Sequence, residues 1–307
     1  MVYDVIIIGS GPAGLSSVIY AQRAMLKALV IEKLPMSGGQ ILNTEEIDNY
    51  AGMPGMAGFD MGMKFREHAD KLGATFAEGN VVRVDVQDKI KKVHTEDGTV
   101  YETKTVILAN GAEHAKMGVK GEEEFGGRGV SYCATCDGAF YRNKVTAVFG
   151  GGDVAVEDAI FLSRICTKVY LVHRRDQLRA AKVLQEEVLH LDNVEVIWDH
   201  ELQEITGEGK VEKVIIKNKK DDSLRELTID GVFIGIGMAP QTAIYKDSGI
   251  ALDERGYIIA GEDCTTNVPG VFVAGDVRTK QLRQVITACA DGAVAITNIE
   301  RYLIENK

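Results

Sequence analysis

The chain has 307 residues, of which 45% are hydrophobic and 26% are charged, and its formal net charge is −10. This length and composition are ordinary for a globular protein of about two domains, with ample chain for two cores. The acidic balance argues against nucleic acid and anionic membranes as partners, since both need basic patches, and no stretch approaches the roughly 18 apolar residues of a membrane span.

Five cysteines are present, and only Cys133 and Cys136 are close to each other in the sequence. An odd number with one close pair argues against a secreted disulfide framework and favours one redox or metal pair in a reducing cytoplasm. We interpret the lone Cys166, Cys264 and Cys289 as small core residues.

The chain opens with an apolar run that leads into a glycine-rich turn and a helix. Residues 1–8 include Asp4 within their apolar run and lack the basic residues with which a signal peptide begins, so we expect a buried strand there and not a signal peptide. Gly9 permits a sharp turn, Gly11 lets a pyrophosphate approach the backbone, and Gly14 lets the helix pack closely on the strand. Free N–H groups at the helix start complete a dinucleotide-binding loop, whose residues are Gly9, Gly11, Pro12, Ala13 and Gly14.

A second strand, residues 28–31, ends in Glu32. A carboxylate there accepts hydrogen bonds from a ribose 2'-hydroxyl and repels a 2'-phosphate, so the first ligand is predicted to be FAD or NAD and not NADP. We expect a functional loop over 35–58 and a helix over 59–72. Alternation of Val82, Val84 and Val86 with polar residues then predicts a strand, and Asp97-Gly98 predicts a hairpin turn.

The strand, glycine turn and helix then recur from residue 145. Gly150, Gly152 and Ala155 occupy the places of the first three glycines, and the next strand, 169–172, ends in His173-Arg174-Arg175, with Arg179 one turn further on. Arginines at this position offer bidentate donors to a phosphate dianion, which favours NADP(H), although a solvated basic patch is the alternative. Opposite charges at the two ribose positions therefore imply two different dinucleotides.

Near the C-terminus, a short apolar strand delivers Gly275-Asp276, and Arg283-Gln284 precede the last helix. A carboxylate at the end of this strand can accept hydrogen bonds from polyol hydroxyls such as a ribityl chain, and the helix N-terminus can face a flavin ring. An Asp in an ordinary turn is the alternative interpretation.

Taken together with the run Cys133-Ala134-Thr135-Cys136-Asp137, these motifs resemble the bacterial low-molecular-weight thioredoxin reductases, in order and spacing, over nearly the whole chain. The resemblance implies a homodimeric α/β flavoprotein with two Rossmann-like dinucleotide-binding domains, the second inserted into the first. It implies an FAD-binding domain over 1–113 and 244–307 and an NADPH-binding domain over 114–243. Asn110, where the family usually has Thr, and Gln241, where it usually has Asn, depart from the pattern.

The resemblance also implies a reaction and a partner. A hydride passes from NADPH to FAD, and two electrons then reduce the Cys133–Cys136 disulfide. Cys136 would face the flavin, Cys133 would attack the disulfide of thioredoxin or a thioredoxin-like protein, and Asp137 would move protons, although Asp137 could instead cap the turn. Rotation of one domain, hinged near 112–118 and 238–243, would alternate the steps.

The resemblance assigns the site residues as follows, with no metal site. We expect FAD to be bound by Gly9, Gly11, Pro12, Ala13, Gly14, Glu32, Gln40, Asn49, Gly111, Gly275, Asp276, Arg283 and Gln284. We expect NADPH to be bound by Gly150, Gly152, Asp153, Ala155, His173, Arg174, Arg175 and Arg179.

Four alternatives stay open at this point. A zinc module would use the close cysteine pair, but structural zinc generally needs four ligands. A thiol-independent flavin oxidoreductase would leave the pair idle. A reductase of a peroxiredoxin system carries an additional N-terminal thioredoxin-like region, whereas here the first nucleotide strand begins at residue 3. A ferredoxin-dependent relative would lack the features of Gly150 and Arg174-Arg175.

Overall fold

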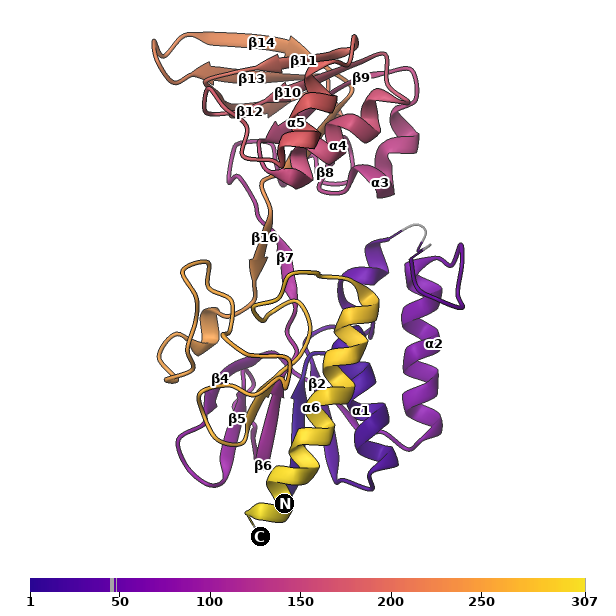
Figure 1. Cartoon of the computed structure of the whole chain (residues 1–307), viewed down its shortest axis with the longest axis vertical. Coiled ribbons are helices and arrows are strands. Elements are labelled where there is room, and N and C mark those ends of the chain that lie inside the picture. Colours follow the sequence, from indigo (N-terminus) through magenta and orange to yellow (C-terminus); the bar gives the residue numbers. More distant parts are fainter. Residues whose placement is uncertain (45–46, 48, 307) are drawn as a thin grey trace. The chain divides into compact units, whose positions relative to one another are not determined.

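The structure is a computed structural model that describes residues 1–44, 47 and 49–306, without the side chains of Asn43 and Cys136. The chain divides into two compact units. Unit 1 consists of Met1–Glu113 and Ala239–Lys307, and unit 2 consists of His114–Met238. Each is built around its own β-sheet (Figure 1).

Within the described residues, unit 1 contains a seven-stranded sheet in which β3, β2, β1 and β6 follow one another in parallel. Strand β6 pairs antiparallel with β5 through its first half and parallel with β17 through its last three residues. The strands are β1 (Val2–Ile8), β2 (Ala28–Glu32), β3 (Phe76–Glu78), β4 (Val81–Asp85), β5 (Lys91–Thr95), β6 (Val100–Leu108) and β17 (Val271–Val273). The helices are α1 (Pro12–Arg23), α2 (Gly58–Lys71) and α6 (Val285–Glu305), with 3-10 turns η1 (Gly39–Asn43) and η3 (Ala243–Tyr245).

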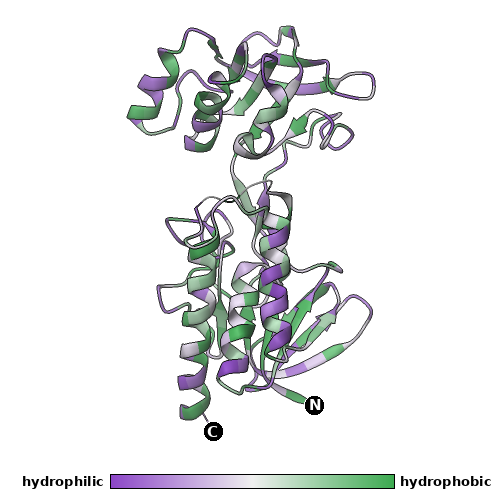
Figure 2. Cartoon of the chain, turned by 90° about the vertical axis from the view of Figure 1, so that its right-hand side faces the viewer, coloured by the Kyte–Doolittle hydropathy of each residue, from purple (hydrophilic) through white to green (hydrophobic). Residues whose placement is uncertain are grey.

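Alternation along the central strands divides the core of unit 1 between the two faces of its sheet. Val5 and Ile7 of β1 pack with buried residues of α1 and α6, whereas Ile6 and Ile8 pack on the opposite face with residues that include Tyr245. Because both faces of the sheet are covered, the buried part of β1 is a continuous run of apolar residues. Figure 2 shows these inner strands in green.

In unit 2, the residues described form a five-stranded parallel sheet in the order β11-β10-β9-β15-β8 and a three-stranded antiparallel sheet. The first contains β8 (Val130–Ser131), β9 (Val145–Gly150), β10 (Lys168–Val172), β11 (Val194–Ile197) and β15 (Gly231–Gly235), and the second β12 (His200–Thr206), β13 (Lys213–Asn218) and β14 (Leu224–Thr228). The helices are α3 (Ala134–Asp137), α4 (Asp153–Ser163) and α5 (Lys182–Leu189), with the 3-10 turn η2 (Gly138–Tyr141). Strands β7 (Ala112–His114) and β16 (Met238–Pro240) pair with each other.

The expected α/β class with two Rossmann-like cores is confirmed. In each unit the order is strand, glycine turn, helix and parallel strand, as β1-α1-β2 and β9-α4-β10. The hairpin expected at Asp97-Gly98 joins β5 to β6, and Gly98 adopts a positive φ of 87° there. No described helix combines the length and the apolarity needed to cross a bilayer.

One strand differs from the expected alternation. Val84 and Val86 are buried, as the period of two requires, but Val82 is 42% exposed. The pairing of β4 with β5 shifts its register between Val81 and Arg83, and the irregularity turns Val82 out of the core while Val81 is buried instead.

Candidate functional site

The glycine turn of unit 1 has the geometry that its sequence predicts. Gly9 has a φ of 101°, and a Cβ placed on it would lie 2.5 Å from the carbonyl oxygen of Ala109. A Cβ on Gly14 would lie 1.9 Å from the carbonyl oxygen of Gly9, so no other residue fits there. Helix α1 begins after Gly11 with Pro12 in its first turn and no side chain capping its N-terminus. Its first amides are therefore available to an anion.

Glu32, at the end of β2, is already part of a hydrogen-bond network with this turn. Its Oε2 atom accepts hydrogen bonds from the amide of Ser10 at 2.7 Å and from the Ser10 hydroxyl at 2.8 Å. The segment that follows β2 is also bound to Ser10, because the backbone amide of Gly38 donates a hydrogen bond to the Ser10 carbonyl oxygen at 2.9 Å. Gln40 lies exposed two residues later, in η1.

The predicted residues near the C-terminus come together around the start of α6. Asn49 donates to Oε1 of Gln284 at 2.9 Å, and Gln284 forms a capping box with Thr287. The Arg283 guanidinium lies 3.4 Å from the carbonyl oxygen of Asp276 and stacks on the Tyr257 ring at 4.0 Å.

Asp276 has the features of a ligand-binding carboxylate. Its Oδ1 atom is buried and has no hydrogen-bond partner among the described residues. Burial raises the pKa of Asp276, and the charges of Lys280 and Arg283 partly offset that effect. A buried carboxylate oxygen without a donor is unfavourable unless a donor arrives with a ligand, so this atom fits a polyol hydroxyl of a bound flavin nucleotide.

A buried ionic cluster that the sequence did not indicate holds this turn in place. Asp291 of α6 accepts hydrogen bonds from the Gly275 amide at 2.8 Å, from Nε and Nη2 of Arg278 at 2.9 and 2.7 Å, and from Lys280 at 2.8 Å. The side chains of Arg278 and Lys280 are only 3% and 6% exposed. Burial would raise the pKa of Asp291, but these donors outweigh it and hold the pKa below its usual range.

Two further positions in unit 1 concern the expected departures from the family pattern. The side-chain oxygen Oδ1 of Asn110 accepts a hydrogen bond from the hydroxyl of the fully buried Tyr245, so this side chain has a structural partner. The amide of Gln241 donates to the carbonyl oxygen of Gly111 at 3.1 Å, and Gly111 has a φ of 72°.

The second glycine turn, in unit 2, repeats the geometry of the first. Gly150 has a φ of 153°, and a Cβ on it would lie 2.4 Å from the carbonyl oxygen of Gly235 and 2.6 Å from Cβ of Ala155. Gly152 precedes α4 with extended backbone angles and no side-chain cap, and a Cβ on it would meet nothing within 4 Å. Asp153 accepts a hydrogen bond from the Ala181 amide at 2.7 Å.

The basic segment after β10 is positioned beside this turn. Arg174, Arg175 and Arg179 are exposed, and the Arg179 amide donates to the carbonyl oxygen of Gly151 at 2.6 Å. His173 is buried, and its ring occupies the space that a Cβ on Gly151 would need. Burial, followed by the charges of the arginines, lowers the pKa of His173, and its Nε2 atom has no partner within the described part of the chain.

The cysteine pair lies on a compact turn of unit 2. Cys133 is half-buried and disulfide-bonded, and α3 begins at the next residue. The hydroxyl of Ser131 accepts a hydrogen bond from the backbone amide of Cys133 at 3.1 Å and donates one to Oδ2 of Asp137 at 2.6 Å. Ser131 therefore links the cysteine to the acid. The side chain of Cys136 lies outside the described residues.

A second acid near this turn was missed by the sequence analysis. Burial raises the pKa of Asp158 of α4 to about 7, and the backbone of Ala134, the first residue of α3, acts in the opposite direction. Its Oδ2 atom is buried without a partner among the residues that the structure covers. The only sequence signal was a pair of adjacent acids, Glu157 and Asp158, within the largely apolar run Val154–Ser163, which is too common a pattern to single out.

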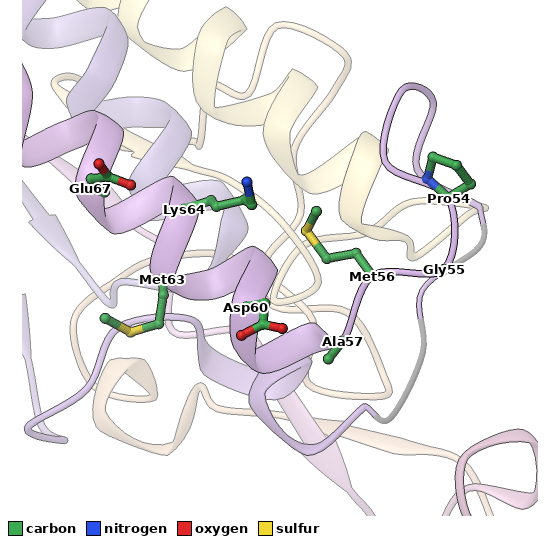
Figure 3. A pocket seen from close by; sticks show the side chains of 8 residues that line it. All are labelled: Pro54, Gly55, Met56, Ala57, Asp60, Met63, Lys64 and Glu67. Carbon is green, nitrogen blue, oxygen red and sulfur yellow. The ribbon is translucent and has the colours of Figure 1, made fainter.

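Unit 1 also carries a surface pocket formed by the segment 54–57 and the first turns of α2 (Figure 3). Its lining consists of Pro54, Gly55, Met56, Ala57, Asp60, Met63, Lys64 and Glu67. None of these is a predicted site residue. Among the described residues, no group of three or more His, Cys, Asp or Glu side chains is arranged to hold a metal ion.

Comparison with known proteins places these features in context. Residues 3–292 match the pyridine nucleotide-disulphide oxidoreductase family. The chain is 45% identical over 307 residues to a thioredoxin reductase of Listeria innocua, and the match covers all of this chain and 95% of that protein. It is 44% identical over 305 residues to a thioredoxin reductase of Bacillus subtilis, covering 99% of this chain and 96% of the relative. The crystal structure of Lactococcus lactis thioredoxin reductase in the FR conformation is similar with a TM-score of 0.79, at 43% identity and over 99% of both chains.

Proposed function

The chain belongs to the pyridine nucleotide-disulphide oxidoreductase family, and we propose that it is an FAD-containing, NADPH-dependent thioredoxin-disulfide reductase. The observation that carries the proposal is the turn around Cys133, a disulfide-bonded cysteine linked through Ser131 to Asp137. A disulfide and a carboxyl held together on a unit that also has a nucleotide-binding turn are suited to thiol–disulfide exchange driven by a nicotinamide cofactor.

The residues of unit 1 support FAD as its ligand. The first turn of α1 offers uncapped amides to a pyrophosphate, and Glu32 lies at the end of β2, where a ribose would be bound. The unpartnered Oδ1 of Asp276 would accept a hydrogen bond from the ribityl chain. Arg283 and Gln284 at the start of α6 would lie beside the flavin ring.

The residues of unit 2 support NADPH. Gly152 leaves open space in front of the α4 amides for the pyrophosphate, and the exposed Arg174 and Arg175 would bind the 2'-phosphate. The buried His173 would hold the turn through Gly151, while Arg179 is tied to the same glycine by its backbone.

FAD, when bound, accepts a hydride from NADPH and passes two electrons to the disulfide. In this chain Cys136 would be the cysteine nearer the flavin and Cys133 the one that attacks the disulfide of thioredoxin, so that the mixed disulfide forms at Cys133. Asp137 would deliver and remove the protons at the sulfurs, with Ser131 keeping its carboxyl in position.

Three parts of the proposal rest on the family resemblance and the cysteine pattern. We expect a homodimer, activity in the reducing cytoplasm and a thioredoxin or thioredoxin-like partner. We also expect the segments 112–118 and 238–243 to act as hinges between the step that involves NADPH and the step that involves thioredoxin.

An anaerobic titration tests the proposal. NADPH should bleach the flavin absorbance of the purified holoenzyme, NADH should do so far more weakly, and addition of thioredoxin should then generate its thiols. Protein without a flavin spectrum would refute the proposal, and a flavin that NADPH does not bleach would favour a ferredoxin-dependent enzyme.

Cysteine variants test the use of the dithiol. Cys136→Ser should abolish thioredoxin reduction while NADPH still bleaches the flavin. Cys166→Ala, which removes a buried cysteine of the same unit that lies outside the turn, serves as the matched control and should retain activity. Full thioredoxin reduction by Cys136→Ser would instead indicate a thiol-independent oxidoreductase.

A further inference from the structure

The turn that follows β17, at Gly275, is packed between two helices of unit 1. Helices α1 and α6 lie side by side (Figure 1). A Cβ on Gly292 of α6 would lie 2.4 Å from the carbonyl oxygen of Ala13 in the first turn of α1, and a Cβ on Gly275 would lie 2.9 Å from Cβ of Ala13. Ser16 of α1 also donates a hydrogen bond to the carbonyl oxygen of Cys289 on α6 at 2.7 Å. The Gly275 turn, α6 and the start of α1 are therefore close-packed against one another.

Asp291, the residue before Gly292 on α6, binds this turn. Its carboxylate accepts a hydrogen bond from the Gly275 amide and a bidentate pair from the Arg278 guanidinium. Arg278 also closes the turn, because its backbone amide donates to the carbonyl oxygen of Gly275 at 3.3 Å. One buried carboxylate thus holds the first and the last residue of the turn through charge-assisted hydrogen bonds.

Two residues that are expected to bind FAD take their positions from the same network. The carboxyl of Asp276 lies within the turn, and its buried Oδ1 atom has no partner among the described residues. The Arg283 guanidinium donates to the carbonyl oxygen of Arg278 at 3.2 Å and to that of Asp276 at 3.4 Å. Backbone atoms of a turn that Asp291 holds therefore place both the carboxyl and the guanidinium.

Stability alone does not account for the ionic character of this cluster. Arg278 and Lys280 share the single carboxylate of Asp291, and none of the three side chains is more than 7% exposed. Because burying charges is costly, apolar side chains of similar volume would hold α6 in place about as well. They would, however, offer no acceptor to the Gly275 amide. What the buried carboxylate adds is the orientation of the turn.

We propose that Asp291 is a positioning residue for FAD. Its bonds to the Gly275 amide and to Arg278 fix the turn before the cofactor arrives. Asp276 and Arg283 then need no rearrangement on binding, and a preorganised site binds more tightly because less conformational entropy is lost. This role deepens the proposed function and rests on it, because it requires that unit 1 binds FAD.

The test measures how tightly the purified holoenzyme holds FAD. The holoenzyme is diluted in steps, and the fluorescence of released FAD gives the dissociation constant. The visible circular dichroism of the bound flavin reports on the surroundings of its ring. Asp291→Asn keeps the size of the side chain and removes its charge. Ile299→Ala is the matched control, because it removes a fully buried apolar side chain from the same helix, outside the network.

We expect Asp291→Asn to weaken FAD binding by about tenfold or more, since hydrogen bonds to a charged group contribute at least that factor. The circular dichroism of the flavin that stays bound should also change. Ile299→Ala should lower the Tm but keep the dissociation constant within about twofold of the wild type, because a core cavity leaves the turn intact. Wild-type FAD affinity in Asp291→Asn, or an equal loss in Ile299→Ala, would overturn the inference.

An apolar replacement of the whole cluster separates orientation from stability, and it also serves if Asp291→Asn does not fold. The combination of Arg278→Met, Lys280→Met and Asp291→Leu removes all three charges, so the Tm should return toward that of the wild type. FAD binding should stay about tenfold weaker or more, because the Gly275 amide has lost its acceptor. Wild-type FAD affinity in this variant would show that the cluster serves the fold only.

The measurement needs neither NADPH nor thioredoxin. If the variants lose FAD as expected but thioredoxin is not reduced, the proposed substrate is wrong and the role of Asp291 stands. If thioredoxin is reduced and the variants keep FAD as tightly as the wild type, only the role of Asp291 is wrong. Wild-type protein that binds no FAD would overturn both.

Discussion

Substitution of Gly152 by alanine should separate NADPH binding from folding. Gly152 precedes α4 with a φ of −93°, which any residue adopts, and a Cβ there would meet nothing within 4 Å of the protein. Loss of glycine at a helix N-cap costs roughly 0.5–1 kcal/mol, and the lower entropy of the unfolded chain offsets about the same amount. The free energy of unfolding should therefore stay within about 1 kcal/mol of the wild type.

The added methyl group does, however, occupy the space through which a pyrophosphate would approach the backbone amides of α4. Steric conflict of this kind costs about 1–3 kcal/mol, which corresponds to a roughly 5- to 140-fold weaker affinity for NADPH. Calorimetric titration with NADP⁺ and the KM for NADPH measure this loss, while the flavin spectrum and the Tm report on the fold.

Gly150 provides the matched control, because the same chemical change is made two residues away with the opposite expectation. Its φ of 153° is unfavourable for alanine, and the new Cβ would lie 2.4 Å from the carbonyl oxygen of Gly235. Gly150→Ala should lower the Tm and the yield of folded protein. A folded Gly152→Ala variant that binds NADP⁺ within twofold of the wild type would show that the pyrophosphate does not approach this turn.

Three further variants test the site. Arg174→Ala combined with Arg175→Ala should raise the KM for NADPH by roughly tenfold or more and leave that for NADH unchanged, since charge-assisted hydrogen bonds contribute about 1.5–3 kcal/mol each. Asp276→Ala should weaken FAD binding to the apoprotein, measured by fluorescence titration, without lowering the Tm of the apoprotein, because the lost Oδ1 has no partner among the described residues. Asp291→Asn leaves Arg278 buried without its countercharge and should reduce the free energy of unfolding by about 3–5 kcal/mol, measured by urea denaturation.

The contribution of Asp291 should also depend on pH in a defined direction. Its pKa is held below the usual value of an aspartate, so its stabilising effect is present above the unfolded pKa and is lost as the pH falls through the folded pKa. The difference in stability between Asp291→Asn and the wild type should therefore shrink below about pH 4. Glu67→Gln, which breaks an exposed pair with Lys71, is the control and should change stability far less. Equal losses in the two variants would contradict the assignment of Asp291 as the buried anchor of the turn.

Local sequence determined the repeated nucleotide-binding architecture. The strand, the glycine turn and the helix are encoded within about 25 neighbouring residues, because positive φ angles and close backbone contacts admit only glycine at Gly9, Gly14 and Gly150. The opposite charges of Glu32 and Arg174 could be read in the same way, since Glu32 is the last residue of β2 and Arg174 lies two residues after β10, and the motif fixes the ends of both strands.

Tertiary structure alone decided which polar groups are buried and what satisfies them. Asp291 forms hydrogen bonds with Gly275 and Arg278, which lie 16 and 13 residues earlier in the sequence. Asp158 lies beside Ala134, which belongs to a different helix. No local sequence pattern therefore marks either acid. The exposure of Val82 likewise follows from a register shift between two paired strands. Periodicity reports how a segment meets the core, whereas the charge state of a buried acid depends on neighbours that only the folded chain brings to it.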